Sequence, residues 1–251
     1  MDFSVCIDSV FQGVDPLSAL QKVKECGFRY YEFWGWKNKD TEAMRQKAAS
    51  LSLTCAGLCT TSFVLNAPAK RDEYLKGLEE SITEAKKMGC ALLISQVGSD
   101  TGASRSLQHD SIVAGLKACA PMLEESGITL LIEPLNCRID HIGTYLSSSD
   151  EGFAIVDEVG CNNVKLLFDI YHQQITEGDI TRRYSAHLDS IGHFHAAGNP
   201  GRREFYSGEL DYMNIFQSLR SLNYGGLVGL EHFPQGNPVD GLKEIGKYLR
   251  L

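Results

Sequence analysis

Residues 190–204 read SIGHFHAAGNPGRRE, a short apolar run followed by a turn and by charged side chains. The alternation over residues 191–197 predicts a strand with His193 and His195 on one side and an aromatic ring on the other. The Gly-Asn-Pro-Gly sequence at 198–201 then predicts a sharp turn. Imidazoles and guanidinium groups in this arrangement favour a site for a metal and an anionic or polyhydroxylated ligand. A satisfied core histidine beside a solvated arginine pair is the alternative for this stretch alone.

The combination of an apolar strand and a following helix recurs along the whole chain. Several helical patterns end at glycines that are typical helix terminators, including Gly27, Gly127 and Gly160. We predict strands at residues 3–8, 30–34, 54–60, 91–97, 129–135, 164–170, 191–197 and 227–232. We predict helices at residues 15–26, 40–51, 71–88, 110–126, 150–159, 180–188, 212–222 and 239–249.

Eight strand–helix units in strict alternation predict an α/β fold with a parallel sheet. The predicted strands are continuous apolar runs, as expected when both faces of the sheet are buried. Eight such units in 251 residues predict a closed (β/α)8 TIM barrel. We expect a single domain over residues 1–251, because no Pro- or Ser-rich linker divides the chain. A doubly wound open sheet is the alternative, but no glycine-rich phosphate-binding turn follows the first predicted strand.

The composition argues against several classes of function. The chain has a net charge of −8 and no run of Lys and Arg, so we expect no nucleic-acid partner. No apolar run approaches the roughly 18 residues that a membrane span requires, and no basic segment of a signal peptide is present at the N-terminus. The eight cysteines are scattered without a C-x-x-C pair, which predicts buried thiols in a reducing, cytoplasmic compartment.

Four consecutive predicted strands end in a residue that can bind a cation: Glu133, Asp169, His195 and Glu231. Their separations, 169 − 133 = 36, 195 − 169 = 26 and 231 − 195 = 36, each match about one strand–helix unit, so the four side chains should converge at the mouth of the barrel. Three carboxylates and an imidazole suit Mn²⁺, Mg²⁺ or Co²⁺ better than a structural zinc. A solvated strand end is the simpler account of any single carboxylate, but burying three together requires a cation or raised pKa values.

Six short motifs surround these strand ends: EPLN at 133–136, DIYH at 169–172, GHFH at 192–195, PGR at 200–202, GELDY at 208–212 and GLE at 229–231. Together they resemble the hydroxypyruvate isomerase branch of the xylose isomerase-like TIM barrels. That superfamily also contains ketose 3-epimerases, inosose dehydratase and endonuclease IV. The resemblance extends over nearly the whole chain and is strongest over residues 132–234.

The resemblance implies a role for each motif. The four strand-end residues would be the metal ligands, and Glu133 and Glu231 would also act as the acid–base pair. His172 and Arg202 would contact substrate oxygens. For His172 the alternative is to orient a metal ligand, and for Arg202 it is a salt bridge to a nearby glutamate, at position 204 or 209.

Two departures from the family patterns leave the substrate open. Hydroxypyruvate isomerases usually carry Gln where this chain has His195, whereas the epimerases carry His. The glutamate that epimerases place shortly after the first ligand is missing, and CRIDH at 137–141 stands there instead.

Other residues at the same end of the predicted strands complete the candidate site. Glu32 and Trp34 end the second predicted strand, and we expect Glu32 and Asn136 to contact substrate. Both Glu32 and Trp34 are candidates to line the cavity, but for Trp34 the sequence favours a packed aromatic cluster, because Trp36 follows closely. His193 and His232 are candidates for supporting the site from behind.

The resemblance and the ligand pattern predict a metal-dependent isomerase or epimerase of small keto sugars or hydroxy-keto acids. Such a reaction removes a proton next to a carbonyl group, so the enzyme must stabilise an enediolate and hold a carboxylate that moves the proton. A ketose 3-epimerase of the D-tagatose/D-psicose type is the first alternative, and a dehydratase that expels a β-hydroxyl is the second.

Two further classes are less well supported. DNA repair of the endonuclease IV type would need several metals and a basic groove, whereas the chain offers one ligand set and a negative charge. A non-catalytic sugar-binding role would be indicated by the loss of one glutamate, yet both are present. We expect a small-molecule partner and no membrane partner. A homo-oligomer, either a dimer or a tetramer, is compatible with the sequence.

Overall fold

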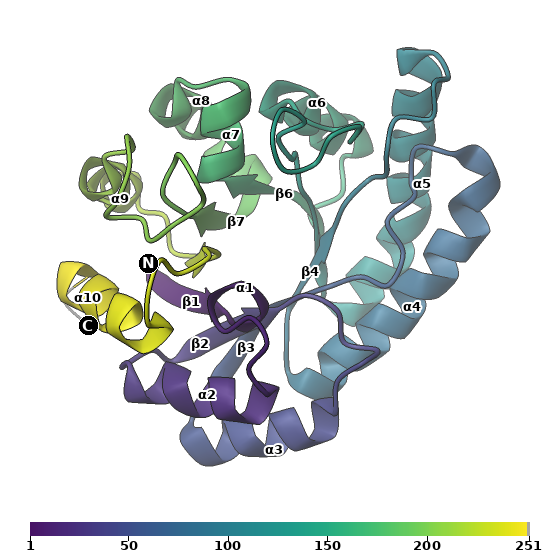
Figure 1. Cartoon of the computed structure of the whole chain (residues 1–251). Helices are drawn as coiled ribbons and strands as arrows, with labels where there is room; N and C mark the ends of the chain where they lie inside the picture. Colours follow the sequence, from purple (N-terminus) through teal and green to yellow (C-terminus); the bar gives the residue numbers. More distant parts are fainter. Residues whose placement is uncertain (250–251) are drawn as a thin grey trace.

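The computed structural model describes residues 1–249, and its eight parallel strands form a closed barrel in sequence order (Figure 1). The strands are β1 (Asp2–Cys6), β2 (Tyr30–Phe33), β3 (Thr54–Cys59), β4 (Leu92–Ser95), β5 (Thr129–Ile132), β6 (Val164–Asp169), β7 (Ile191–Ala196) and β8 (Leu227–Leu230). Pairing of Val5 with Leu230 closes the barrel between β1 and β8. The predicted (β/α)8 barrel is confirmed, and the open-sheet alternative is wrong.

Helices follow the strands and surround the barrel (Figure 1). They are α1 (Ile7–Val10), α2 (Pro16–Glu25), α3 (Thr41–Leu51), α4 (Arg71–Met88), α5 (Arg105–Ser126), α6 (Ser149–Val159), α7 (Ile170–Thr176), α8 (Ile180–Ala186), α9 (Tyr212–Ser221) and α10 (Pro238–Leu249), with 3-10 turns η1 (Pro68–Lys70) and η2 (Leu188–Ser190). Within residues 1–249, none of these helices has the length and apolar character needed to cross a bilayer.

Caps and glycines set many of the helix ends. Asp15 accepts a hydrogen bond from the backbone N–H of Ser18 at 2.9 Å, and Pro16 occupies the first position of α2. Gly89 ends α4 in the left-handed conformation, with φ of 67°. These signals explain why the helix boundaries are close to those predicted.

Some boundaries differ from the prediction for local reasons. Helix α5 begins at Arg105 rather than near residue 110, because Ser104 caps it by accepting from the backbone N–H of Leu107 at 3.4 Å. Strand β5 ends at Ile132, since Pro134 has no backbone N–H to continue the ladder. Helices α1 and α7 were not predicted, because four and seven residues are too few to show a helical period.

The outer face of the barrel packs against the helices. Phe168 of β6 and Phe194 of β7 both contact Tyr184 of α8 edge to face, with ring centroids 6.1 and 5.6 Å apart. All three rings are fully buried. Each such burial contributes about 2 kcal/mol to stability, so this layer holds the strand ends in fixed positions.

The inner face of the barrel is divided in two. The apolar half consists of Ile94, Leu131 and Leu167, which pack together from β4, β5 and β6. The polar half, from β1, β2, β7 and β8, contains Ser4, Glu32, His193 and Gly229. Both halves are buried, so the interior of the barrel has an apolar part and a polar part, and both lie beneath the same open end of the barrel.

Candidate active site

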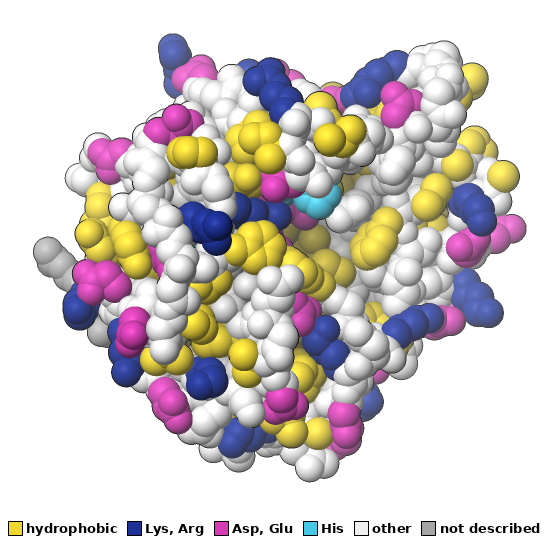
Figure 2. Space-filling model, in the orientation of Figure 1, with side chains coloured by type: hydrophobic (Ala, Val, Ile, Leu, Met, Phe, Trp, Pro, Cys, Tyr) yellow, Lys and Arg dark blue, Asp and Glu magenta, His cyan; other side chains and the backbone are white. Residues whose placement is uncertain are grey.

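A cavity of about 660 Å³ opens at the mouth of the barrel, where β2, β5, β7 and β8 end. Figure 2 shows it as a hollow bordered by hydrophobic, basic and acidic side chains and by histidine. The apolar lining includes Trp34, Trp36, Phe63, Ile94, Leu135 and Phe233. The polar lining includes Gln96, Glu133, Asp140, His141, His195, Arg202 and Glu231. An apolar wall with a few convergent polar groups is typical of a small-molecule site.

Four ionisable side chains meet at the floor of this cavity. One donor atom of each lies within 4.8 Å of the others in a four-residue cluster of Glu133, Asp169, His195 and Glu231. All four side chains are buried, and Asp169 and His195 are direct neighbours in the β6–β7 ladder. The structure therefore brings together the four residues that end consecutive predicted strands.

Three side chains that line the cavity hold Glu231. Trp34 Nε1 donates a hydrogen bond to Glu231 Oε1 at 2.6 Å. Arg202 pairs with Oε2, and His195 Nδ1 lies 3.2 Å from the same oxygen. Burial opposes ionisation of Glu231, but the charges of Arg202 and His195 outweigh it and hold its pKa well below the usual range. Trp34, for which a packed aromatic cluster was favoured, instead lines the cavity and contacts Glu231.

Glu133 lacks comparable partners. Its Oε1 is buried without a hydrogen-bond partner and lies 3.9 Å from His195 Nδ1. Burial, and next the charge of Glu231, raise the pKa of Glu133 to about 8. The pKa values of the two glutamates are therefore shifted in opposite directions, because Arg202 pairs with Glu231 rather than with Glu133.

The backbone of α7 orients Asp169. Its Oδ1 accepts from the backbone N–H groups of Tyr171 at 2.8 Å and His172 at 3.2 Å, so the carboxylate caps the helix. Its Oδ2 faces the cluster, 3.5 Å from Arg202 Nη2. Burial raises the pKa of Asp169, and the charge of Arg202 partly offsets that rise. One carboxylate oxygen is thus used by the fold and the other is left for the site.

Arg202 enters the cavity from the loop between β7 and α9. The backbone N–H of Phe233 donates to Arg202 O at 2.8 Å, and the loop closes on itself where Gly198 N–H donates to Arg203 O at 2.7 Å. Arg202 is buried, with a left-handed φ of 54°. Its guanidinium pairs with Glu231 and Asp169, so the alternative salt bridge to a nearby glutamate in its own loop is wrong.

His172 and Asn136 lie behind the cavity wall. His172 is fully buried, and its Nε2 is 3.6 Å from Asp169 Oδ2. The Asn136 amide nitrogen lies 2.6 Å from His172 Nδ1 and donates to Asp140 Oδ2 at 2.6 Å. Neither His172 nor Asn136 is among the residues that line the cavity. Their predicted contacts with substrate stay predictions.

Glu32 also lies away from the cavity lining, buried beneath His195. Conversely, Asp140 and His141 line the cavity, although their segment was recognised only as a departure from the epimerase pattern. Asp140 accepts a hydrogen bond from Tyr171 at 2.9 Å as well as from Asn136. Asp140 and His141 follow the fifth predicted strand closely, and this position was the signal in the sequence that could have placed them at the cavity.

The donor set of the four-residue cluster fits a divalent cation. Glu133 Oε1 and His195 Nδ1 are buried without hydrogen-bond partners, and three carboxylates meet at one point. Buried lone pairs and like charges of this kind are stabilised when they bind a cation. Carboxylate oxygens with one imidazole nitrogen match the ligand preferences of Mn²⁺, Mg²⁺ and Co²⁺.

The fold and the site together define a (β/α)8 barrel with a buried cluster at its mouth whose donor atoms fit a divalent cation. Residues 20–251 match the family described as xylose isomerase-like TIM barrel, and the chain belongs to that family. The chain is 32% identical to the hydroxypyruvate isomerase of Escherichia coli K12 over 255 aligned residues, which cover 98% of each chain. The protein is therefore an isomerase or epimerase of small keto compounds.

Solved structures show the same fold. An AP endonuclease, family 2, from Brucella melitensis superposes with a TM-score of 0.94 at 26% identity and covers 99% of both chains. A D-psicose 3-epimerase from Clostridium cellulolyticum has a TM-score of 0.80 at 20% identity, covering 97% of this chain and 89% of that one. Both similarities show that this (β/α)8 fold also occurs in other proteins of known structure.

Proposed function

We propose that the protein isomerises a 3-hydroxy-2-oxo acid, hydroxypyruvate or a slightly longer homologue, by moving the carbonyl group to the neighbouring carbon. The observation that carries this proposal is the pair of glutamates in one buried cluster, beside an arginine in the same cavity. The name of the relative from Escherichia coli supports the substrate class.

The reaction moves one proton between neighbouring carbons. Glu133 or Glu231 removes a proton from the hydroxyl-bearing carbon C3, and the electrons of that C–H bond form the C2–C3 double bond of an enediolate. A proton returns to C2, and the hydroxyl hydrogen moves from the C3 oxygen to the C2 oxygen, which leaves a carbonyl group at C3, an aldehyde in the product of hydroxypyruvate and a ketone in that of a longer homologue. A divalent cation held by the four-residue cluster would supply positive charge that stabilises the enediolate oxygens.

Arg202 is the reason to prefer an acid as substrate. Its guanidinium is buried at the cavity wall, where a planar fork can bind a carboxylate through two parallel hydrogen bonds. Trp34 would hold Glu231 through its indole hydrogen bond while the proton moves. For His172 we propose the alternative role of orienting Asp169, because it lies behind that carboxylate.

Deuterium incorporation tests the proposal. The protein is loaded with Mn²⁺, Mg²⁺ or Co²⁺ in turn and incubated in D₂O with hydroxypyruvate, its four-carbon homologue and a panel of ketoses. We expect deuterium at C2 of a 2-hydroxy-3-oxo acid, followed by NMR. No exchange with any oxo acid would contradict the proposal.

A ketose 3-epimerase is the second candidate, favoured by His195, the residue that the epimerases carry at this position. The same experiment separates the two, because an epimerase incorporates deuterium at C3 of a ketose. Loss of water from the product would instead indicate a dehydratase.

The remaining features of the proposal concern partners and location. We propose a cytoplasmic enzyme, in line with eight unpaired cysteines. We propose a homo-oligomer of two or four subunits and no nucleic-acid partner. Light scattering after size exclusion measures the first, and incision of DNA with an abasic site would contradict the second.

A further inference from the structure

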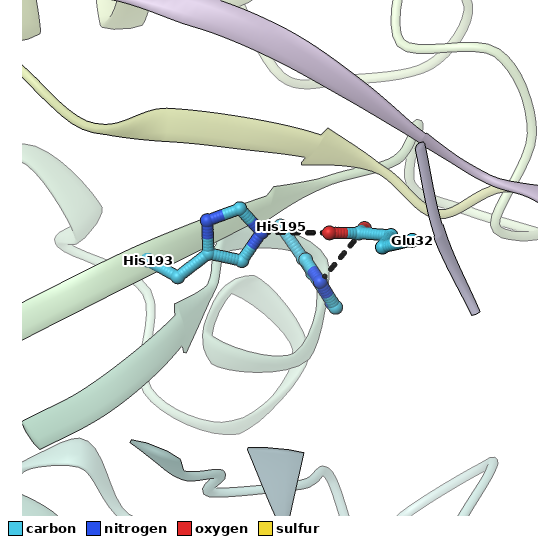
Figure 3. Close-up of side chains that lie close together, drawn as sticks. All are labelled: Glu32, His193 and His195. Carbon is cyan, nitrogen blue, oxygen red and sulfur yellow. Dashed lines mark hydrogen bonds and ion pairs between the residues drawn. The ribbon is translucent and has the colours of Figure 1, made fainter. Parts of the chain in front are cut away.

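The polar half of the barrel contains a carboxylate between two imidazoles, directly below the four-residue cluster. Figure 3 shows Glu32 facing both His193 and His195. Glu32 Oε2 lies 2.9 Å from His193 Nε2, and Oε1 lies 3.1 Å from His195 Nε2. All three side chains are buried, so water does not compete for these contacts.

His195 therefore connects two groups of carboxylates. Its Nδ1 faces the cluster, 3.2 Å from Glu231 Oε2, while its Nε2 faces Glu32. Glu32 Oε1 and His195 Nε2 are in ion-pair contact but outside hydrogen-bond geometry, and the charge of the carboxylate favours the ring form that carries a proton on the nearer nitrogen, Nε2. In the neutral ring, this leaves the lone pair on Nδ1, which is the nitrogen that points at the cluster.

The carboxylate of Glu32 is itself held in place. Ser4 Oγ donates to Glu32 Oε2 at 3.1 Å, so this oxygen accepts from β1 as well as facing His193 of β7. Gly229 of β8 leaves the space that the carboxylate needs, because a Cβ there would overlap Glu32 Oε1 and lie 2.6 Å from His195 Cδ2. Four strands thus position one carboxylate against one ring nitrogen.

We propose that Glu32 is a positioning residue that fixes the tautomer and the ring orientation of His195, so that Nδ1 is presented to a divalent cation in the four-residue cluster. Ser4 and His193 hold Glu32 for this task. The inference rests on the cation of the proposed function. It assigns Glu32 an action through His195 rather than a contact with substrate.

Binding of Mn²⁺ tests the inference without relying on turnover. Equilibrium dialysis or electron paramagnetic resonance measures the affinity and the stoichiometry for the wild type and for Glu32→Gln. We expect one site in both, with affinity lowered about 10- to 100-fold in the variant, the usual effect of losing a partner of a metal-binding histidine. Glu84→Gln, which alters another buried glutamate on α4 outside the cavity, should bind Mn²⁺ like the wild type.

A second measurement needs no substitution in the network. In the protein with ¹⁵N-labelled histidine and diamagnetic Mg²⁺ bound, long-range ¹⁵N–¹H spectra report which nitrogen of His195 carries the proton. We expect the proton on Nε2. A proton on Nδ1 would overturn the inference even if Glu32→Gln failed to fold.

The other outcomes are equally decisive. Unchanged affinity in a folded Glu32→Gln protein would overturn the inference while leaving the proposed function intact. Two Mn²⁺ ions in the wild type and one in the variant would show that Glu32, His193 and His195 bind a cation themselves, which also overturns it. A wild type that binds no divalent ion at all would remove both the inference and the cation of the proposed function.

Discussion

The two halves of the barrel interior are both buried, but one is filled by apolar side chains and the other by polar side chains that contact one another. In the apolar half, Leu131 and Leu167 need only volume and exclusion of water. In the polar half, Glu32 and His193 are just as deeply buried, and each faces a partner of complementary charge or hydrogen-bonding capacity. The apolar half should therefore determine stability, whereas the polar half should determine how well the mouth binds and reacts.

The largest expected effect is on turnover, and it comes from substituting Glu231, which lies above the polar half. Glu231→Gln keeps the shape of the side chain but removes the carboxylate, so we expect turnover to fall by about 10³-fold or more, which is about 4 kcal/mol or more of barrier. The thermal midpoint should stay close to that of the wild type, as measured by circular dichroism. A fully active variant would contradict the role proposed for Glu231.

A substitution in the apolar half should lower the stability of the protein and leave kcat nearly unchanged. Leu131→Ala leaves a cavity beside Ile94 and Leu167, and we expect a loss of about 2–5 kcal/mol in the free energy of unfolding. Urea denaturation measures this loss, and kcat at a temperature where the variant is folded should remain near the wild-type value. A large fall in kcat with little loss of stability would contradict the claim that the apolar half determines stability rather than activity.

Removal of the cation tests whether the polar side also contributes to stability. Dialysis against a chelator should abolish turnover, and excess Mn²⁺ should restore it. At a free ion concentration of about 100 times Kd, binding adds roughly 2.7 kcal/mol to the free energy of unfolding. The metal-dependent shift in thermal midpoint should persist in Leu131→Ala, since that side chain is not a donor. Equal activity before and after chelation would contradict a metal-dependent reaction.

The smallest effect comes from adding one methyl group to the polar half. In Gly229→Ala the new Cβ collides with Glu32 and His195, so we expect a loss of about 1–3 kcal/mol in stability and weaker Mn²⁺ binding. Gly57→Ala on β3 is the matched control, because its Cβ would come no closer than 3.5 Å to any neighbour. Equal metal affinity in the two variants would show that the space at Gly229 is not needed by the site.

The sequence predicted the barrel because its signals repeat in every unit. Most strands are buried and largely apolar, and several helices end at a glycine such as Gly89 or Gly127. The convergence of Glu133 and Glu231 followed from topology alone, since strand ends of a closed barrel share one mouth. Periodicity and spacing are thus sufficient where the backbone dictates the position of a side chain.

The other contacts depend on side-chain orientation, which spacing does not encode. Glu32 and Trp34 end the same strand, yet one points below His195 and the other lines the cavity and donates to Glu231. Asp140 reaches the cavity on a loop without a period. The partner of Arg202 likewise could not be derived, because its left-handed backbone turns it away from the glutamates in its own loop.

The seam between β1 and β8 carries one more consequence. Glu231 follows β8, whereas Glu32 lies in β2 and Trp34 directly follows it, so segments about 200 residues apart in the sequence meet around His195. A nascent chain still missing its final strand would expose the edge of β1 and lack one of the four donors. Assembly of the reactive centre therefore requires synthesis of the chain through β8, and chains truncated before Glu231 should be inert.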